Sequence, residues 1–403
     1  MCPLRFSALY SAQMKGSVNV NEPIHFITSI SIYFKSKSGI YVMSELPGII
    51  DSREFQQADF EKITAIVGAE FQIQEALMDQ GTPTYYLVQP QETKHAFLRS
   101  LKRLEEINLI AFLRKIDGKL VLRVFSKPPV KPSNSRTNWI LFLATVATTF
   151  FTGYTGFSET GLHPLLNGAM FSAAILAVLG IHEMGHKLTA NRKGIDATAP
   201  YFIPGFPPYG TFGAVIMQKS LPRNRDALFD VGANGPIAGF LVALVCSVVG
   251  LTLLIPTTIT SDSGALSLIP VSWSLLMPAL SAFNLIPALG THNGFALHPI
   301  TWAGWVGMVV TMLNLLPAAM LDGGHVARSV ISNDRFRLVF TFASVALLLL
   351  SGTTFILMAF LIIFMATFKH PGPLDDVSGL SRNRKLLIAV LILAFVLAFP
   401  ISI

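Results

Sequence analysis

Residues 167–188, NGAMFSAAILAVLGIHEMGHKL, place ionisable side chains in a stretch that otherwise suits lipid. Residues 167–180 carry no charge, and His182, Glu183 and His186 follow directly. Each of these groups costs several kcal/mol to remove from water unless it finds a partner. The stretch therefore predicts a membrane helix that carries a polar site.

The composition extends this prediction to most of the chain. Of 403 residues, 52% are hydrophobic and 13% are charged, and the long apolar runs all follow residue 137. These features are typical of a polytopic membrane protein. The net charge of +7 does not predict a nucleic-acid partner, because no basic cluster is interleaved with aromatic residues. Cys2 and Cys246 are too few for a disulfide framework, and we expect neither to bind metal.

The chain before the apolar runs divides into three parts. Residues 1–43 lack the apolar segment of a signal peptide, and Met43 is a second candidate start. Residues 44–127 predict a small soluble α+β domain with a regulatory or docking role. Residues 128–137 are rich in Pro and Ser and predict a linker.

Within the soluble domain, apolar periodicity predicts helices and strands that alternate along the chain. The order is helix, strand, strand and helix, at 56–71, 71–78, 84–90 and 92–108. A hairpin follows at 109–125, with Asp117-Gly118 at its turn. We expect one sheet with helices on a face.

Seven apolar segments after the linker predict membrane-spanning helices. They lie at about 138–155, 167–190, 230–255, 299–321, 335–351, 353–368 and 385–403. An eighth apolar segment, 268–290, contains Pro270, Pro278 and Pro287, which argue against a straight helix. We expect this segment to be re-entrant or interfacial.

The positions of Lys and Arg support this topology. If 268–290 does not cross, sixteen basic residues fall on one side, and none falls in the opposite loops 156–166 and 256–298. Cytoplasmic loops are enriched in Lys and Arg, so we expect the N-terminal domain on the cytoplasmic side. Residues 138–368 then form an intramembrane core, and 369–403 form a cytoplasmic loop and the last helix.

The sequence H-E-x-x-H at His182–His186 has the spacing of a metal site. On a helix the two histidines lie four residues apart on one face, so both imidazoles reach one cation. Glu183 follows the first histidine and can hold a water on that metal. This pattern predicts two zinc ligands and a general base, with a polar contact between helices as the alternative.

Zinc catalysis needs three protein ligands and an open position for water. By the charge topology, the segments 167–190 and 299–321 both end on the cytoplasmic side, so Asp322 matches the histidines in depth. Pro317 and the pair Gly323-Gly324 allow the irregular backbone that a segment lining a metal site needs. We therefore expect Asp322 to be the third ligand. Other metal-binding side chains lie at unsuitable depths, namely Cys246, His163, His292 and His298.

These motifs together resemble the site-2 protease family of intramembrane zinc metalloproteases, in peptidase family M50. The resemblance covers about residues 138–368 and is nearest to the plant plastid and related prokaryotic branch with a soluble N-terminal domain. It rests on the H-E-x-x-H span followed by N-x-x-P-x-x-x-x-D-G at Asn314 to Gly323, with GTFGAVI (210–216) and NGPIAGF (234–240) between them.

The resemblance implies that His182, His186 and Asp322 bind Zn²⁺ and that Glu183 activates the hydrolytic water. It implies membrane-embedded protein substrates that are cut near the cytoplasmic face. The membrane is then the cytoplasmic membrane of a prokaryote or a plastid membrane. The chain has no PDZ-like insertion, and its 256–298 segment is longer than in the minimal six-span form. These departures leave substrate recruitment open.

The segment 211–218 and the residue Asn314 each have an expected role beside the metal. The β-prone segment 211–218, with Gly213 and Val215, is either a strand that pairs with unwound substrate or a loop that shields the site. Asn314 either donates to the oxyanion and substrate or forms a hydrogen bond between helices. We expect Asp375-Asp376 to be solvated in a cytoplasmic loop.

Two other functions fit parts of the pattern. A metal-transporting protein or an inactive homologue would use the same His/His/Asp site, but neither needs the general base Glu183. Another type of membrane metallopeptidase would use a glutamate as third ligand, but the later spans contain no acidic residue at a suitable depth. An intramembrane zinc endopeptidase is therefore the function that the sequence favours.

Overall fold

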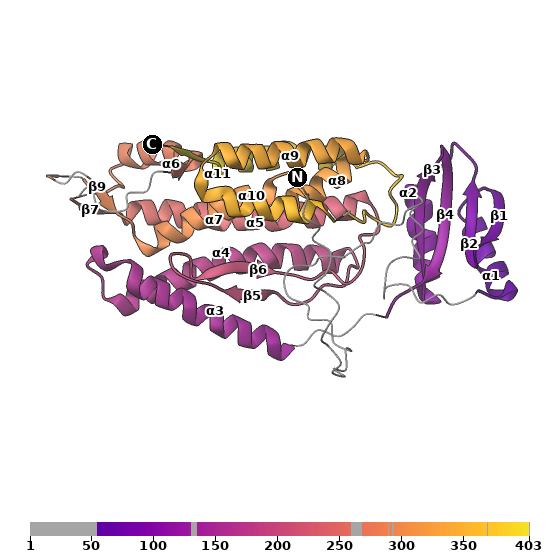
Figure 1. The fold of residues 1–403 in the computed structure, drawn as a ribbon, viewed down its shortest axis with the longest axis horizontal. Coiled ribbons are helices and arrows are strands. Elements are labelled where there is room, and N and C mark those ends of the chain that lie inside the picture. Colours follow the sequence, from indigo (N-terminus) through magenta and orange to yellow (C-terminus); the bar gives the residue numbers. More distant parts are fainter. Residues whose placement is uncertain are drawn as a thin grey trace, which may run out of the picture.

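The structure is a computed structural model that describes residues 55–129, 135–258, 268–288, 290–291, 294–368 and 370–402. It is mostly helical, with a small α/β unit at one end of an elongated helical bundle (Figure 1). Residues 1–43 and the first part of the expected soluble domain lie outside the described residues.

The N-terminal unit has the predicted order of elements. It consists of α1 (Gln57–Gly68), β1 (Ile73–Asp79), β2 (Thr82–Leu87), α2 (Lys94–Glu106), β3 (Leu109–Ile116) and β4 (Lys119–Ser126). The strands form one antiparallel sheet in the order β1-β2-β4-β3. Asp117 and Gly118 have φ values of 48° and 81° at the turn between β3 and β4, the positive values that a two-residue hairpin turn requires.

Three helices of the bundle are long and apolar enough to cross a membrane, by length and composition. They are α3 (Ser135–Gly156), α4 (Pro164–Arg192) and α5 (Arg225–Thr252). Shorter helices follow along the chain, namely α6 (Val271–Ala282), α7 (Pro299–Leu315), α8 (Asp322–Val330), α9 (Asp334–Leu350), α10 (Ile356–Ala366) and α11 (Arg382–Ala398). Large apolar side chains on the outside of the bundle are exposed, as expected for a lipid-facing surface; they include Trp139, Ile140, Leu357 and Leu386.

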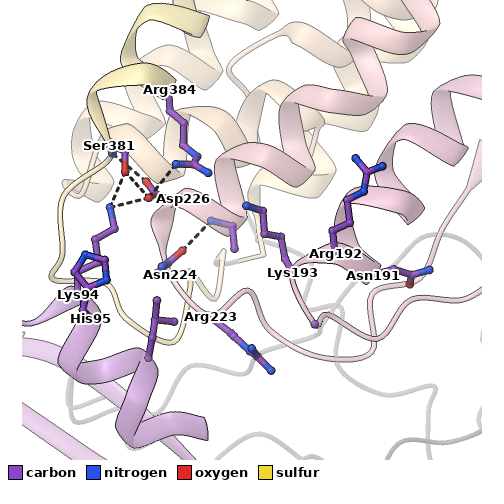
Figure 2. Close-up of a pocket in the computed structure, with 13 residues that line it drawn as sticks. Lys94, His95, Asn191, Arg192, Lys193, Arg223, Asn224, Asp226, Ser381 and Arg384 are labelled. Atoms are coloured by element: carbon purple, nitrogen blue, oxygen red, sulfur yellow. Dashed lines mark hydrogen bonds and ion pairs between the residues drawn. The ribbon is translucent and has the colours of Figure 1, made fainter. Parts of the chain in front are cut away.

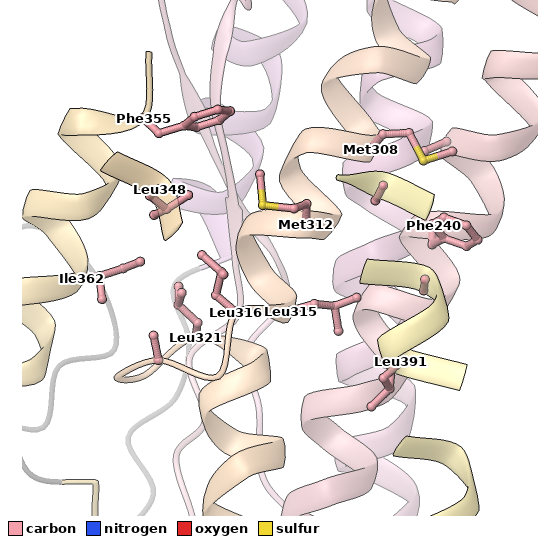
Figure 3. Packing of buried hydrophobic residues seen from close by; sticks show 14 of the residues in the cluster. Phe240, Met308, Met312, Leu315, Leu316, Leu321, Leu348, Phe355, Ile362 and Leu391 are labelled. Atoms are coloured by element: carbon pink, nitrogen blue, oxygen red, sulfur yellow. The ribbon is translucent and has the colours of Figure 1, made fainter. Parts of the chain in front are cut away.

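The centre of the bundle is apolar and closely packed. One cluster joins α5, α7, α9, α10 and α11, and Figure 3 shows Met308, Met312 and Leu315 of α7 at its centre. Where α7 crosses α5, a Cβ added at Gly307 would lie 2.7 Å from the Cβ of Ala243. Small residues at such crossings let helix backbones approach in membranes, so this contact fixes α7 against α5.

Several short strand pairs lie outside the α/β unit. β5 (Tyr201–Pro204) and β6 (Thr211–Val215) form a hairpin between α4 and α5 in the chain. β7 (Ile255–Thr257) pairs with β9 (Gly294–Ala296), and β8 (Leu268–Pro270) pairs with β10 (Pro400–Ser402). β7, β9 and α6 lie at the end of the bundle opposite the α/β unit (Figure 1).

Three predicted boundaries were wrong. Residues 135–137, expected in the linker, form the first turn of α3. The helix predicted at 299–321 ends at Leu315, because Pro317 has no N–H to continue the helical hydrogen bonds. The last predicted span ends early, because residues 400–402 leave the helix to pair with β8.

The segment 268–290 contains only a short helix. α6 has 12 residues and is therefore about 18 Å long, well below the roughly 30 Å of a bilayer core. β8, just before it, pairs with β10 at the end of the chain. This arrangement fits the expected re-entrant or interfacial segment.

The α/β unit contacts the bundle through the segment before α11. The backbone N–H of Leu113, on the edge strand β3, donates to Leu374 O at 2.9 Å, and Asp376 N donates to Leu113 O at 3.2 Å. On the other side, Leu374 N and Asp375 N donate to Pro222 O and Arg223 O at 2.8 and 3.0 Å. Residues 374–376 thus join the sheet edge to the chain that enters α5.

The prediction that Asp375-Asp376 is solvated was wrong. Asp375 is fully buried, and its Oδ1 accepts hydrogen bonds from the backbone N–H groups of Val377 and Ser378. Asp376 accepts two bonds from Arg328 of α8, at 2.9 and 2.5 Å. Sequence reasoning missed the role of Asp376 because Arg328 lies 48 positions away in the chain.

Asp376 is the centre of a buried cluster of opposite charges. Burial raises the pKa of Asp376, but the hydrogen bonds and charge of Arg328, with the charges of Arg114 and Arg225, outweigh burial and hold the pKa below its usual value. Burial lowers the pKa of Arg114 to about 10 despite the opposing charge of Asp376. Both partners therefore remain charged at neutral pH.

We expect Asp376→Asn to loosen the α/β unit from the bundle. Removing one charge of a buried pair typically costs about 3–5 kcal/mol, because the other charge is left uncompensated. Hydrogen–deuterium exchange should show faster exchange in β3, including the Leu113 amide. The control Asp79→Asn removes the more exposed Asp79–Arg123 pair and should leave that exchange unchanged. Equal protection in Asp376→Asn would contradict this role of Asp376.

Candidate active site

The H-E-x-x-H sequence lies on the inward face of α4. His182, Glu183 and His186 are all buried, with 4%, 8% and 9% exposed surface. Ile181 and Met184, which alternate with them, are more than 40% exposed. The helix therefore turns its polar side chains into the bundle and its apolar side chains outward, as a membrane helix with an internal polar site must.

Asp322 is brought to these histidines by a break between α7 and α8. After α7 ends at Leu315, six irregular residues lead to α8, whose first residue is Asp322. The missing side chain of Gly323 permits this path, because a Cβ there would lie 2.2 Å from Leu315 O. The close approach explains the glycine after Asp322, which the sequence suggested only as a source of irregular backbone.

Three potential ligand atoms of these residues lie together. His182 Nε2 and His186 Nε2 are 3.1 Å apart. Asp322 Oδ2 lies 3.3 Å from His182 Nε2 and 3.2 Å from His186 Nε2. Among the described residues, these three form the cluster of His, Cys, Asp and Glu side chains that is able to hold a metal ion.

The spacing fits a tetrahedral metal site. A zinc ion bound at 2.0–2.1 Å in tetrahedral geometry separates its ligand atoms by about 3.3 Å. The three observed separations, 3.1 to 3.3 Å, are close to that value. Two imidazoles and one carboxylate also leave the fourth tetrahedral position to a water, which is the ligand count of catalytic zinc sites.

A backbone carbonyl orients one of the imidazoles. His186 Nδ1 lies 2.7 Å from Val231 O of α5, so Nδ1 carries the proton and donates it to that carbonyl. The other nitrogen, Nε2, then presents its lone pair to the cluster. Such a partner on the remote ring nitrogen is typical of metal-binding histidines.

Glu183 is close to the ligands without being one of them. The backbone N–H of Ile216, directly after β6, hydrogen-bonds to its carboxylate. Glu183 therefore lies between the metal-ligand cluster and the end of the β5–β6 hairpin. Gly213 and Val215 are in β6, where they pair with Ile203 and Tyr201 of β5; they are beside the site and do not belong to the cluster.

The hairpin is held in place by the helices around it. Thr148 of α3 donates to Gly210 O at 2.7 Å. Trp302 of α7 donates from Nε1 to Pro208 O at 3.0 Å and stacks on the ring of Tyr209. These contacts from two helices position β6 over α4.

Asn314 borders the cluster, whereas the other described histidines of the bundle have separate surroundings. Asn314 Nδ2 lies 3.3 Å from His182 Nε2. His325 Nδ1 lies 2.7 Å from His370 Nε2, a partner that the sequence did not suggest. His163 and His298 cap the starts of α4 and α7. His292 lies outside the described residues.

Two glycines of α5 are part of the site, although their role was not predicted. A Cβ added at Gly235 would lie 2.0 Å from His186 Nε2, and one at Gly239 would lie 2.7 Å from His182 Nδ1. Both belong to NGPIAGF (234–240), the motif that the resemblance singled out without a structural reason. The structure supplies the reason, because α5 must lack side chains where the two imidazoles lie.

Comparison with known proteins agrees with this geometry. The family model of peptidase family M50 matches residues 170–359, which include both histidines, Glu183 and Asp322. The chain is 34% identical over 212 residues to the probable zinc metalloprotease EGY2, chloroplastic, of Arabidopsis thaliana. It is 28% identical over 239 residues to the probable zinc metalloprotease EGY1, chloroplastic, of the same plant.

These alignments cover part of each protein. They include 52% and 59% of this chain, and 36% and 43% of the lengths of EGY2 and EGY1, respectively. The chain thus spans less than half the length of these curated relatives. No solved structure matches the chain.

We expect Gly235→Ala to weaken metal binding. The new methyl group would displace the His186 ring, and disturbing the surroundings of a metal ligand typically lowers affinity by about 10–100-fold. Zinc titration of the purified chain would measure this change. Gly180→Ala on α4 is the matched control, because its Cβ would lie an ordinary 3.6 Å from Phe202. Equal zinc affinity in the two variants would show that α5 does not set the position of His186.

Proposed function

Because the chain belongs to peptidase family M50 over residues 170–359, we propose that it is an intramembrane zinc endopeptidase. It hydrolyses peptide bonds of membrane-embedded proteins near the cytoplasmic face. The observation that carries this proposal is the cluster of His182, His186 and Asp322, with ligand atoms 3.1 to 3.3 Å apart next to Glu183.

In this proposal each residue of the cluster has one role. His182 and His186 offer Nε2, and Asp322 offers a carboxylate oxygen. The carbonyl of Val231, 2.7 Å from His186 Nδ1, keeps that imidazole neutral and oriented. Zinc, when bound there, lowers the pKa of a water molecule and polarises the scissile carbonyl group.

Glu183 is the proposed general base and acid. Its carboxylate accepts a proton as the water oxygen attacks the carbonyl carbon. It then gives that proton to the nitrogen of the leaving amine when the C–N bond breaks. The hydrogen bond from the Ile216 N–H fixes the carboxylate between the attacked carbonyl and the substrate strand. Asn314, beside His182, donates its Nδ2 hydrogen toward the carbonyl oxygen as negative charge develops there.

The β5–β6 hairpin is the proposed place where substrate binds. The peptide bonds of a transmembrane helix are hidden in hydrogen bonds between residues four apart, so the helix must unwind before hydrolysis. Among the described strands, β6 pairs only with β5, and a Cβ at Gly213 would meet nothing within 4 Å. An extended substrate can therefore pair with the other edge of β6 and reach Glu183.

The topology in this proposal has seven spans, with the α/β unit on the cytoplasmic side. Helices are present at all seven expected segments, and the proline-rich segment 268–290 is left out because a crossing there would move seven of the sixteen basic residues to the opposite side. The one-sided distribution of sixteen Lys and Arg residues sets the orientation. The membrane is that of a plastid, as the names of the plant relatives suggest, or the cytoplasmic membrane of a prokaryote. The partners are protein substrates and lipid.

The test of the enzymatic proposal is Glu183→Gln, assayed on a co-expressed single-span substrate. Glutamine keeps the size of the side chain but cannot take the proton. We expect cleavage to fall by about 10²–10⁴-fold, while zinc content measured by atomic emission stays at one ion per chain.

Its control is Asp322→Asn, which should lose zinc together with cleavage. Equal cleavage by wild type and Glu183→Gln would rule out Glu183 as the base. A wild-type protein that binds no zinc would favour the inactive homologue instead, and zinc flux across vesicles without cleavage would favour a transporter.

The role of β6 is tested separately with Ala214→Pro. Ile216 N–H points to Glu183, so by strand alternation the Ala214 N–H also faces the open edge. Proline removes this N–H, which an added strand needs, so cleavage should fall at least tenfold while zinc content stays unchanged. Ala214→Ser keeps the N–H and should retain activity. Hydrogen exchange over β5 verifies that the hairpin remains folded. Full cleavage by a folded Ala214→Pro protein would exclude strand pairing at this position.

A further inference from the structure

A cavity lies where the α/β unit meets the bundle, away from the cluster of His182, His186 and Asp322. It has a volume of about 630 Å³, within the range of sites that hold small molecules. Its walls come from α2 of the α/β unit, the end of α4, the start of α5 and the start of α11 (Figure 2). The cavity is thus formed only when the two parts of the molecule are together.

The lining of this cavity is strongly basic. Five Lys and Arg side chains line it, against one carboxylate, that of Asp226; the five are Lys94, Arg192, Lys193, Arg223 and Arg384. Two carboxylates outside the lining also pair with these cations, namely Asp230 with Lys193 and Arg384, and Glu105 with Arg223. Five cations and three carboxylates leave an excess of two positive charges. Lys and Arg side chains only donate hydrogen bonds, so these cations need acceptors from a ligand or from the few polar groups of the lining.

One wall already binds an oxyanion that belongs to the protein. Asp226 Oδ2 lies 2.7 Å from Lys94 Nζ and 3.1 Å from Arg384 Nη1. The backbone N–H and the hydroxyl of Ser381 donate to the same carboxylate, at 2.9 and 2.5 Å. An ammonium, a guanidinium, a hydroxyl and a backbone amide are the donors with which proteins bind phosphate groups.

The opposite wall has cationic side-chain groups that no carboxylate of the described residues contacts. Arg192, the last residue of α4, is exposed, and its side chain has no hydrogen bond or ion pair with the other described residues. Arg223 is paired through one Nη, but its Nε is buried and unpartnered within the described part of the chain. Arg192 is therefore the lining cation that the internal carboxylates leave unpaired.

We propose that this cavity binds a phosphate-bearing anion. An excess of two positive charges attracts either a phosphomonoester, which carries about two negative charges at neutral pH, or a phosphodiester, which carries one. The volume leaves room for the group that the phosphate is attached to. The end of α4, a helix of 29 residues that is apolar enough to cross a membrane, places the cavity at the level of lipid headgroups. An anionic phospholipid headgroup and a soluble phosphate compound share this chemistry, and the experiment separates them.

Binding there would join the two parts of the molecule. Lys94 belongs to α2, whereas Arg192 and Lys193 end the helix that carries His182 and His186. A phosphate held by both sides would replace repulsion between cations by attraction and so stabilise the docked α/β unit. The proposal does not depend on the peptidase activity, because it concerns binding at a separate site.

The test uses the full chain in neutral detergent with two probes, phosphatidylglycerol and ATP. Native mass spectrometry counts the bound molecules over a range of probe concentrations. Arg192→Gln and Lys94→Gln should each weaken binding about tenfold, the factor expected for one lost hydrogen bond to a charged group. Lys102→Gln, an exposed cation on α2 outside the cavity, is the matched control and should bind as wild type does.

The outcomes distinguish a lipid headgroup from a soluble phosphate compound, and they also test the proposal itself. Binding of phosphatidylglycerol alone, lost in the cavity variants, identifies a lipid headgroup, and the same result with ATP alone identifies a soluble phosphate compound. Binding of both probes by wild type, lost in the cavity variants, identifies a general phosphate site. Binding of neither probe by wild type, or equal binding by wild type and Arg192→Gln, would overturn the proposal. Arg192 has no partner to lose, so its variant remains informative if Lys94→Gln fails to fold.

Discussion

The structure depends on the cost of burying ionisable groups in an apolar bundle. His182, His186 and Asp322 are tolerated there because their ligand atoms converge within 3.3 Å. The convergence constrains three helices at once. α4 must present its histidines inward, and the chain must break between α7 and α8. α5 must have no side chain at Gly235 and Gly239, where the imidazole rings lie. Motifs that look separate in the sequence therefore serve one cluster.

A second set of polar contacts connects this cluster to the α/β unit. α8 begins with Asp322 and, two turns later, carries Arg328, which binds Asp376. Asp376 N in turn donates to Leu113 O on the edge of the sheet. An edge strand needs a partner for its backbone groups, and the segment 374–376 supplies it. The same short segment thus completes the sheet and holds the helix that positions a metal ligand.

Prediction from the sequence succeeded where the signal is local. The Asp-Gly turn predicted the β3–β4 hairpin, and the four-residue spacing predicted that His182 and His186 share a helix face. Prediction was wrong where a distant partner decides. Residues 400–402 read as the end of an apolar helix but pair with β8, and Asp376 read as a solvated loop residue but binds Arg328 of α8. No pattern near these residues in the chain indicates their partners.

By itself, the sequence determined which side chains are candidates for metal binding and which segments are apolar, because residue type and helical period are local properties. It also pointed to Asp322 through depth along the helices. Only the tertiary structure decided how closely α5 approaches α4, where Asp376 finds Arg328, and that a basic cavity forms beside α2. These features depend on contacts between residues more than 40 positions apart, and their geometry exists only once the helices are packed.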